Sequence, residues 1–375
     1  MEAVDLKKLV IAPDSFKGTM SSRRVAQIIS DAAKAVFTDI ECVCVPIADG
    51  GEGTVDAFGA EHIPVTAAGP HFKKTESFYG LLVDTAIIEL ATAAGLPMTE
   101  PLDPEITTTL GVGELITDAL GRGVRKFIIA LGGSSTNDCG CGMAAACGAK
   151  FYNKNGECFV PCGGTLCDVE RIDLSEMDPR IAESTFVTMC DIDNPLYGEK
   201  GAAYVFAPQK GADGEAVKRL DAGLRSICEV IKRDLNIDTS LLPGAGAAGG
   251  CGAGTVAFFG SELKRGIDVV LETANFADLI KDADMVVTGE GKFDSQSTDG
   301  KALSGIARYT KEAGIPLTVF CGAAEEAEAS YEMGVSAVFS IQRKALPFDE
   351  AKKLNEQGLY KTAYNVFRMI REFSK

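Results

Sequence analysis

The stretch Lys126-Phe-Ile-Ile-Ala-Leu131, followed by Gly132-Gly-Ser-Ser-Thr-Asn-Asp138, decides the fold class. An apolar run of strand length leads into a loop without bulky side chains, and a segment rich in Gly, Ala and Cys follows at 139–148. Glycines let backbone N–H groups approach a ligand, and a helix N-terminus favours an anion. The same pattern is equally typical of a tight strand-to-helix turn without a ligand, so the repetition of such loops along the chain carries the argument.

Short apolar runs alternate with helical periodicity along the chain, which predicts an α/β fold with parallel strands. Strands are expected at 8–13, 41–47, 283–288, 315–320 and 337–341, and most of them run into loops rich in glycine and polar residues. Ser21 or Ser22 is expected to cap the first helix, and 352–372 is expected to be the closing helix. In open parallel sheets ligands bind at the carboxyl ends of the strands, so these loops are candidate ligand contacts.

The chain has 375 residues, which exceeds one ordinary domain. We expect a Rossmann-like parallel-sheet α/β domain built from both chain ends, 1–66 plus 283–375, with a second α/β domain, 67–282, inserted in it. The runs 78–83 and 85–90 resemble a hairpin of this inserted domain. Residues 120–150 could belong to either domain.

Charge and composition exclude several classes of function. The formal net charge of −16 argues against nucleic acid and anionic membranes as partners. The two histidines, His62 and His71, lie in no motif, so any general base is expected to be a carboxylate.

The 12 cysteines contain no C-x-x-C pair, and histidines are lacking near the dense group between 139 and 167. A zinc or iron–sulfur site, or a redox role, is the minor alternative to reduced thiols packed as small apolar side chains. Neither a signal peptide nor an apolar stretch of membrane-spanning length is present, so we expect a cytoplasmic protein.

Two loops near the N-terminus carry charged side chains. In Asp14-Ser-Phe-Lys17, Lys17 is a candidate point charge for a carboxylate or phosphate, although an exposed lysine beside a turn is the simpler interpretation. In Asp49-Gly-Gly-Glu52, two carboxylates among glycines could hold Mg²⁺ through water or bind substrate hydroxyls, or could belong to a simple turn.

Two later loops repeat this arrangement. Asp191 and Asp193 follow the strand-like run 185–189, and Asp191 could accept a proton from a hydroxyl or ligate a metal. The segment 289–294 combines Glu290, Lys292 and Asp294 with glycines after another strand. Each loop could also be an exposed turn.

The run 244–254 is rich in glycine, and 244–249 matches G-x-G-x-x-G. Since no strand precedes it and no βαβ unit surrounds it, a dinucleotide site is not indicated, but a phosphate-binding backbone loop is. Neither a P-loop nor the protein-kinase motifs occur. Anion-binding loops, carboxylates and lysines without histidine suit phosphoryl transfer with Mg²⁺.

Several of these segments, in this order, resemble the type 1 glycerate kinase family nearly end to end. The matching segments are 11–18, 48–54, 89–96, 131–138, 190–198, 208–212, 243–254, 289–294 and 296–297. The resemblance implies ATP-dependent phosphorylation of D-glycerate, usually to 2-phosphoglycerate in bacterial members, and two α/β domains with an active-site cleft between them. Lys292 stands where the family often has Arg, and Lys cannot make the bidentate phosphate contact of Arg.

On this basis Asp191 is the expected catalytic base or hydroxyl-orienting residue, with Lys17 as a second catalytic residue. The substrate-binding candidates are Asp14, Ser15, Asp49, Glu52 and Asn194. The ATP- and phosphate-binding candidates are Gly132, Gly133, Ser134, Ser135, Thr136, Asn137, Gly246, Gly249 and Gly250. The Mg²⁺ candidates are Asp193, Glu290 and Asp294.

The expected partners are small molecules, D-glycerate and ATP, with no nucleic acid and no membrane, and the chain is expected to be a monomer or a homodimer. Two alternatives stay open: a kinase for another small hydroxy acid, and a sugar-acid or nucleotide sensor without turnover. A dehydrogenase is a weaker third alternative.

Overall fold

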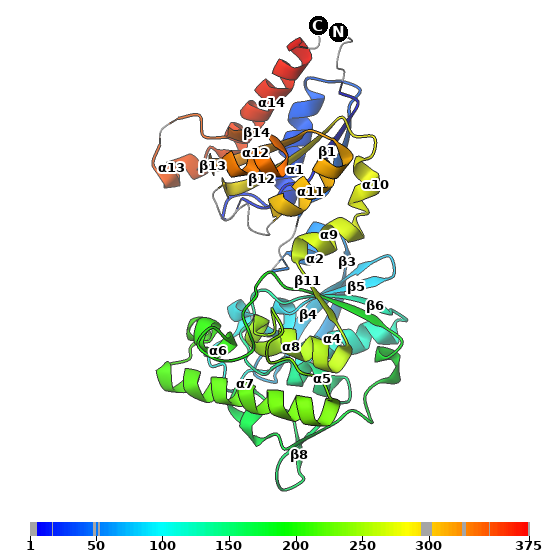
Figure 1. Cartoon of the computed structure of the whole chain (residues 1–375), viewed down its shortest axis with the longest axis vertical. Coiled ribbons are helices and arrows are strands. Elements are labelled where there is room, and N and C mark those ends of the chain that lie inside the picture. The colour runs from blue at the N-terminus through cyan, green and yellow to red at the C-terminus, as the bar shows by residue number, and fades with distance from the viewer. Residues whose placement is uncertain are drawn as a thin grey trace. The chain divides into compact units, whose positions relative to one another are not determined.

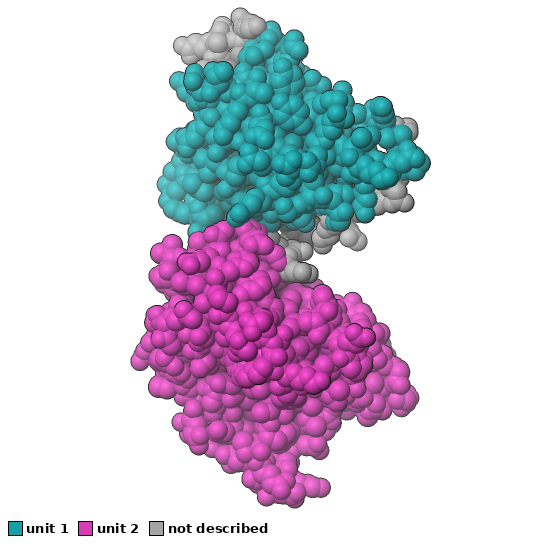
Figure 2. All heavy atoms as spheres, turned by 180° about the vertical axis from the view of Figure 1, so that it is seen from behind, with its two compact units in different colours: residues 1–48, 267–375 teal, residues 49–266 magenta. Residues whose placement is uncertain are grey.

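The computed structural model describes residues 6–16, 18–47, 50–51, 53–293, 302–324, 328–344 and 346–373, without the side chains of 329, 348 and 349. The chain forms two compact units, coloured separately in Figure 2. Unit 1 comprises 1–48 and 267–375, and unit 2 comprises 49–266, so unit 2 is inserted into unit 1 along the sequence. Segments 49–66 and 267–282 thus fall in the opposite units from those expected, and the ambiguous 120–150 falls in unit 2.

Unit 1 contains a five-stranded parallel sheet in the order β14-β13-β12-β1-β2. Both chain ends contribute strands, and β1 from the N-terminal end pairs with β12 from the C-terminal part. This agrees with the expected Rossmann-like parallel sheet. The strands are β1 (Lys8–Ile11), β2 (Glu41–Cys44), β12 (Met285–Phe293), β13 (Leu317–Ala324) and β14 (Val335–Ser340).

Helix α1 (Ser22–Lys34) begins after Ser21, whose side chain accepts the N–H of Arg24 at 3.3 Å, as its capping pattern predicts. Its apolar face is buried, and it packs beside α14 (Asn355–Phe373), the red helix of Figure 1. The other helices of this part of the chain are α9 (Gly266–Thr273), α10 (Phe276–Ile280), α11 (Ala302–Ala313), α12 (Glu328–Met333) and α13 (Phe348–Lys352).

The segment from Gly289 was predicted to be a loop, and that prediction is wrong for Gly289–Phe293. These residues continue β12 and pair in parallel with β13, with Glu290 opposite Cys321 and Phe293 opposite Ala324. The neighbouring strand is long enough to satisfy their backbone groups, and this non-local pairing overrides the local turn propensity of the glycines.

Unit 2 contains a six-stranded mixed sheet in the order β11-β10-β6-β5-β4-β3. Strands β5, β6, β10 and β11 are parallel, whereas β3-β4 and β4-β5 are antiparallel, so the predicted hairpin is confirmed. The strands are β3 (Glu61–Ala68), β4 (Lys74–Leu82), β5 (Thr85–Glu89), β6 (Lys126–Ala130), β10 (Thr185–Met189) and β11 (Glu262–Lys264). A smaller sheet contains β7 (Lys150–Tyr152), β8 (Cys158–Phe159) and β9 (Arg171–Asp173).

The helices of unit 2 include α7 (Gly214–Leu235), the long green helix of Figure 1. The others are α2 (Thr54–Phe58), α3 (Ala91–Ala94), α4 (Leu110–Gly121), α5 (Cys141–Ala146), α6 (Ala202–Phe206) and α8 (Ala247–Phe259). Short 3₁₀ turns occupy Leu96–Met98, Gly163–Asp168, Pro179–Ile181 and Pro208–Lys210. Throughout the described residues, no helix combines the length and apolar character needed to span a membrane.

The glycine-rich run 244–254 was expected to be a loop, but most of it lies in α8. The helix is interrupted at Ala248, Gly249 and Gly250, whose φ angles are all positive. Glycine adopts this backbone conformation at little cost, which explains two of the three residue choices. The segment is therefore a kinked helix start, and its glycines also permit close packing.

Candidate active site

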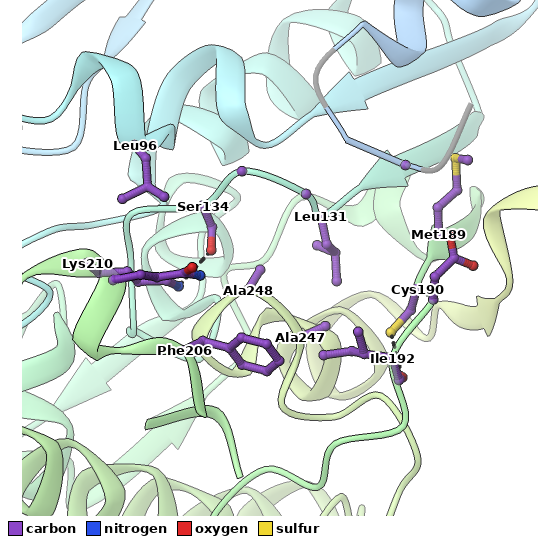
Figure 3. A pocket seen from close by; sticks show the side chains of 15 residues that line it. Leu96, Leu131, Ser134, Met189, Cys190, Ile192, Phe206, Lys210, Ala247 and Ala248 are labelled. Carbon is purple, nitrogen blue, oxygen red and sulfur yellow. Dashed lines mark hydrogen bonds between the residues drawn. The ribbon is translucent and has the colours of Figure 1, made fainter. Parts of the chain in front are cut away.

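A pocket of about 240 Å³ lies within unit 2, where β6 and β10 end (Figure 3). One part of its wall is apolar and includes Leu96, Ile192 and Phe206. The polar part comprises Gly132–Ser134, Asp191 and Lys210, among others. An apolar pocket with a few polar groups is the usual form of a small-molecule site, and its position at the carboxyl ends of parallel strands agrees with the sequence-based expectation.

The predicted phosphate loop divides into two parts. Gly132, Gly133 and Ser134 line the pocket, whereas Ser135, Thr136 and Asn137 are almost fully buried and are not among its lining residues. Gly132 has no room for a side chain, because an added Cβ would lie 2.5 Å from the Cα of Gly51. The close approach joins this loop to 50–51, since the Gly132 N–H donates to the Gly50 carbonyl at 2.9 Å.

Hydrogen bonds from neighbouring segments hold the buried part of the loop. Both the N–H and the hydroxyl of Ser135 donate to the Ala94 carbonyl, at 2.9 and 3.1 Å. The Ser135 carbonyl accepts the hydroxyl of Thr107 at 3.0 Å. Within the described part of the chain, the buried amide oxygen and nitrogen of Asn137 have no hydrogen-bond partner. The roles of Ser135, Thr136 and Asn137 in phosphate binding stay predictions.

Lys210 also belongs to the pocket wall, and sequence reasoning did not predict it as a site residue. Its side chain is almost fully buried, and its ammonium donates to the Ser134 hydroxyl at 2.8 Å (Figure 3). It also donates to the Thr136 carbonyl at 2.7 Å. Burial lowers the pKa of Lys210 to about 8, because desolvation disfavours the charged form. Gly211, at φ +102°, turns the chain immediately after it and passes so close to Leu102 that a Cβ would meet its carbonyl oxygen at 2.3 Å.

Asp138 ends the loop as a buried carboxylate. It accepts hydrogen bonds from the N–H and hydroxyl of Thr109 at 2.7 and 2.8 Å, and from the N–H groups of Gly140 and Gly142 at 3.1 and 3.3 Å. Burial raises its pKa against the opposing effect of these donors. Asp138 therefore ties the end of the loop to the beginnings of α4 and α5.

Asp191, the predicted base, is solvent-exposed and lies in the pocket wall just beyond β10. Its Oδ1 accepts the N–H of Gly266 at 2.8 Å, which restrains the carboxylate. Asp193 is also exposed in the same loop, and the side-chain amide of Asn194 donates to the Lys200 carbonyl at 2.8 Å. The loop thus presents two carboxylates, and Asn194 shapes it from within.

Glu89, at the end of β5, is a second residue that sequence reasoning did not select as a site residue. It is buried, and its carboxylate accepts the N–H of Val55 at 2.6 Å and the N–H of Gly53 at 3.2 Å. It thereby holds the start of α2, which follows Asp49 and Glu52 in the sequence. Those two candidates lie outside the described residues.

The glycines of 244–254 pack against protein. An added Cβ on Gly249 would lie 2.1 Å from the Thr136 carbonyl oxygen, and one on Gly246 would lie 2.4 Å from the Pro195 carbonyl oxygen. Gly250 is similarly close to Leu224. From this segment, Ala247 and Ala248 line the pocket. Phosphate binding by Gly246, Gly249 and Gly250 stays a prediction.

In unit 1, the candidates Asp14, Ser15 and Glu290 lie where β1 and β12 run side by side. The Asp14 N–H donates to the Gly289 carbonyl at 2.8 Å, and the Asp14 carboxylate accepts the Ser15 N–H at 2.6 Å. The structure thus brings three sequence-predicted residues together beside the adjacent strands β1 and β12. The candidates Lys17 and Asp294 lie outside the described residues.

The described part of the chain contains no group of three or more His, Cys, Asp or Glu side chains arranged to hold a metal ion. The 12 cysteines are free thiols. Desolvation raises the pKa of the buried thiols of Cys139, Cys141 and Cys147, the last to about 12. These thiols therefore have the surroundings of small apolar core residues rather than of metal ligands.

Comparison with known proteins connects this geometry to a family. The model of the glycerate kinase family matches residues 9–371. The chain is 43% identical to a glycerate kinase of Bacillus cereus and 42% identical to a glycerate 2-kinase of Escherichia coli, in each case over 96% of this chain and 97% of the relative. A crystal structure described as a glycerate kinase 2 from Salmonella typhimurium LT2 is similar with a TM-score of 0.89 and 38% identity, over 98% of this chain and 99% of that one.

Proposed function

The chain belongs to the glycerate kinase family and is a phosphotransferase with an alcohol group as acceptor, and on that premise we propose that it transfers the γ-phosphoryl group of ATP to D-glycerate. We infer 2-phosphoglycerate as the product, by analogy with the relative named glycerate 2-kinase. The observation that carries the proposal is the pocket of unit 2, where Asp191, Lys210 and the Gly132–Ser134 backbone converge.

Asp191 is the proposed base or hydroxyl-orienting residue. Asp191 is exposed and belongs to the pocket wall, and its Oδ1 accepts the Gly266 N–H, which restrains the carboxylate toward an incoming hydroxyl. Phosphoryl transfer needs accurate positioning of the nucleophile and charge neutralisation more than strong base catalysis. An oriented carboxylate that accepts the hydroxyl proton meets the first of these needs.

Charge neutralisation, the second requirement of phosphoryl transfer, is the proposed role of the anion-binding groups. In the proposal, the Gly132–Ser134 loop and the start of α8 contact the phosphates, with Ser135, Thr136, Asn137, Gly246, Gly249 and Gly250 supporting them. Gly132 and Gly133 allow the close backbone approach that phosphate binding by N–H groups requires. The proposed support from Gly246, Gly249 and Gly250 acts through their close packing against protein. Asp14, Ser15, Lys17, Asp49, Glu52 and Asn194 are the proposed contacts of the glycerate carboxylate and hydroxyls.

Mg²⁺ in phosphotransferases is usually held by one or two carboxylates together with substrate phosphates and water, so a three-residue protein cluster is not required. The exposed carboxylate of Asp193, in the loop after β10, has the right donor chemistry, and Glu290 and Asp294 are the further candidates. When bound, Mg²⁺ would neutralise charge on the phosphates. We place the activity in the cytoplasm, where free thiols such as the 12 of this chain persist.

The experiment that tests this function combines ADP release in the presence of Mg·ATP and D-glycerate with phosphorus NMR of the product. We expect stoichiometric ADP and one phosphomonoester signal at the 2-position. A signal of 3-phosphoglycerate would overturn the proposed position of transfer. Folded protein that binds ATP without releasing ADP would overturn the choice of D-glycerate and favour another hydroxy acid, which a substrate panel would identify.

A further inference from the structure

Lys210 is a lysine in an environment that opposes its charge. It is 2% exposed, and the described residues offer it no carboxylate within hydrogen-bond distance, only the Ser134 hydroxyl and the Thr136 carbonyl. Buried lysines without an ion-pair partner are rare, because desolvating an ammonium costs several kcal/mol, of the order of the penalty for other buried ions. A stabilising structural role alone does not explain the choice of lysine at this position.

The contacts of Lys210 lie on one loop. An ammonium has three N–H donors, and two of them fix the Ser134 side chain and the Thr136 backbone, which lie at either side of Ser135. Lys210 and Gly132–Ser134 also form part of the same pocket wall. No other Lys, Arg or His belongs to the described lining of this pocket, so Lys210 is its source of positive charge.

The groups that face Lys210 leave this charge largely uncompensated at the pocket. Cys251, on α8, and Asp138, at the end of the loop, are the ionisable groups whose charges act on it. Burial raises the pKa of the Cys251 thiol, so it is neutral near pH 8. The charge of Asp138, which accepts four hydrogen bonds from Thr109, Gly140 and Gly142, raises the pKa of Lys210, but desolvation of the ammonium is the larger effect and the net shift is downward. The carboxylate of Asp191 is on the same pocket wall, and Gln209 is uncharged.

We propose that Lys210 is a positioning residue for the phosphoryl donor: its ammonium holds Ser134 and Thr136 so that the Gly132–Ser134 backbone receives a phosphate group, and its charge favours that anion. This inference rests on the proposed function for the identity of the donor, ATP, but its physical content is binding of a polyphosphate. The protonated form of Lys210 is the form that binds. Because burial holds its pKa near 8, polyphosphate affinity should fall above that pH.

The first test uses the unaltered protein. The dissociation constant for inorganic tripolyphosphate and the KM for ATP are measured between pH 7 and 9.5. Both should be constant at the lower end and should rise above about pH 8, by at most about tenfold per pH unit because one proton is linked to binding. Constant affinity across this range would overturn the proposal, and this test does not depend on the folding of any variant.

The second test compares Lys210→Met with Lys126→Met. Lys126 begins β6, the strand that leads into the loop, and its exposed ammonium pairs with Asp84 at 2.6 Å, so its removal changes the net charge equally without touching the pocket. K210M should weaken tripolyphosphate binding at pH 7 at least tenfold and abolish its pH dependence, whereas K126M should retain both. K210M that is folded by circular dichroism and binds tripolyphosphate as tightly as the unaltered protein would overturn the proposal.

The two proposals can fail separately. Tripolyphosphate binding that depends on Lys210 and on pH, without turnover of D-glycerate, would leave the inference standing and overturn the proposed function. Turnover of D-glycerate with a KM for ATP that is insensitive to pH and to K210M would support the proposed function and overturn the inference about Lys210. A K210M variant that raises the KM for D-glycerate alone would also overturn the inference, because Lys210 would then serve the acceptor.

Discussion

Gly249 packs directly against Thr136, and a Cβ on Gly249 would lie 2.1 Å from the Thr136 carbonyl oxygen. That same carbonyl accepts the ammonium of Lys210 at 2.7 Å. The Cys139 N–H donates to the Gly249 carbonyl at 3.1 Å, so the loop after β6 and the kinked start of α8 are joined on both sides of Asp138. The glycine-rich run of α8 therefore supports the loop whose residues Gly132–Ser134 form part of the pocket wall.

The Gly249→Ala variant tests this support, with Gly260→Ala as its matched control. Both glycines have positive φ, 66° and 61°, but no atom lies within 4 Å of a Cβ added at Gly260. We expect G260A to cost about 1 kcal/mol in the free energy of unfolding for the backbone conformation alone. G249A should cost a further ~1–3 kcal/mol for overpacking and should weaken ATP binding. Urea unfolding and the KM for ATP measure the two effects, and equal behaviour of the two variants would contradict the close packing.

The Glu89→Gln variant tests whether the buried carboxylate holds Gly53 and the start of α2. The amide keeps one acceptor, but its NH₂ would face the N–H of Gly53 or Val55, at a cost of about 1–3 kcal/mol. We expect the KM for D-glycerate to rise at least severalfold, because Gly53, which follows the substrate-binding candidates Asp49 and Glu52 in the sequence, loses a hydrogen bond that fixes it. Glu114→Gln is the control, since Glu114 also accepts a backbone N–H, that of Ala68 at 2.6 Å, and is not among the residues that line the pocket. A similar rise in both variants would assign the effect to general destabilisation.

The Asp191→Asn variant tests the proposed base. Asparagine can still accept the Gly266 N–H through its Oδ1, so we expect an unchanged fold by circular dichroism. The kcat should fall at least about a hundredfold, the usual scale for loss of a positioned general base, with little change in the KM for ATP. Asp193→Asn, two residues along the same exposed loop, should instead raise the Mg²⁺ concentration needed for half-maximal rate. Near-full turnover by D191N would exclude Asp191 as the base.

The site residues that sequence reasoning identified follow strands directly. Gly132–Ser134 come after β6 and Asp191 after β10, and adjacent parallel strands bring their carboxyl ends to one edge, so local pattern and sheet geometry suffice to place them together. The positions of β1 and β6 were predicted in the same way, because each of these buried strands is an apolar run.

The missed residues depend on long-range partners. Lys210 contacts Ser134 across 76 positions, Glu89 contacts Gly53 across 36, and Asp138 contacts Thr109 across 29. No local spacing relates these residues, and a lysine after a proline turn has the pattern of an exposed side chain. Glu89 ends a strand in an otherwise apolar run, and that local inconsistency is the one signal that could have identified it.

The pH dependence of stability gives an independent measurement of the Lys210 environment. Below pH 8 the lysine is charged in both the folded and the unfolded chain, and burial of the charge destabilises the fold. Between about pH 8 and the ordinary lysine value of 10.5, the unfolded chain binds the proton more strongly, so the free energy of unfolding rises with pH. The full contribution of this shift is about 3 kcal/mol.

We therefore expect the free energy of unfolding of the unaltered protein to rise relative to that of K210M as the pH increases from 7.5 to 9.5. Urea unfolding at 7.5, 8.5 and 9.5 measures it, and subtraction of the variant removes the contribution of other titrating groups that the two proteins share. The same comparison with K126M controls for the loss of one exposed charge. A difference that is constant with pH would mean that Lys210 keeps its proton in the folded state throughout this range, and the fall in polyphosphate affinity above pH 8 would then need another titrating group.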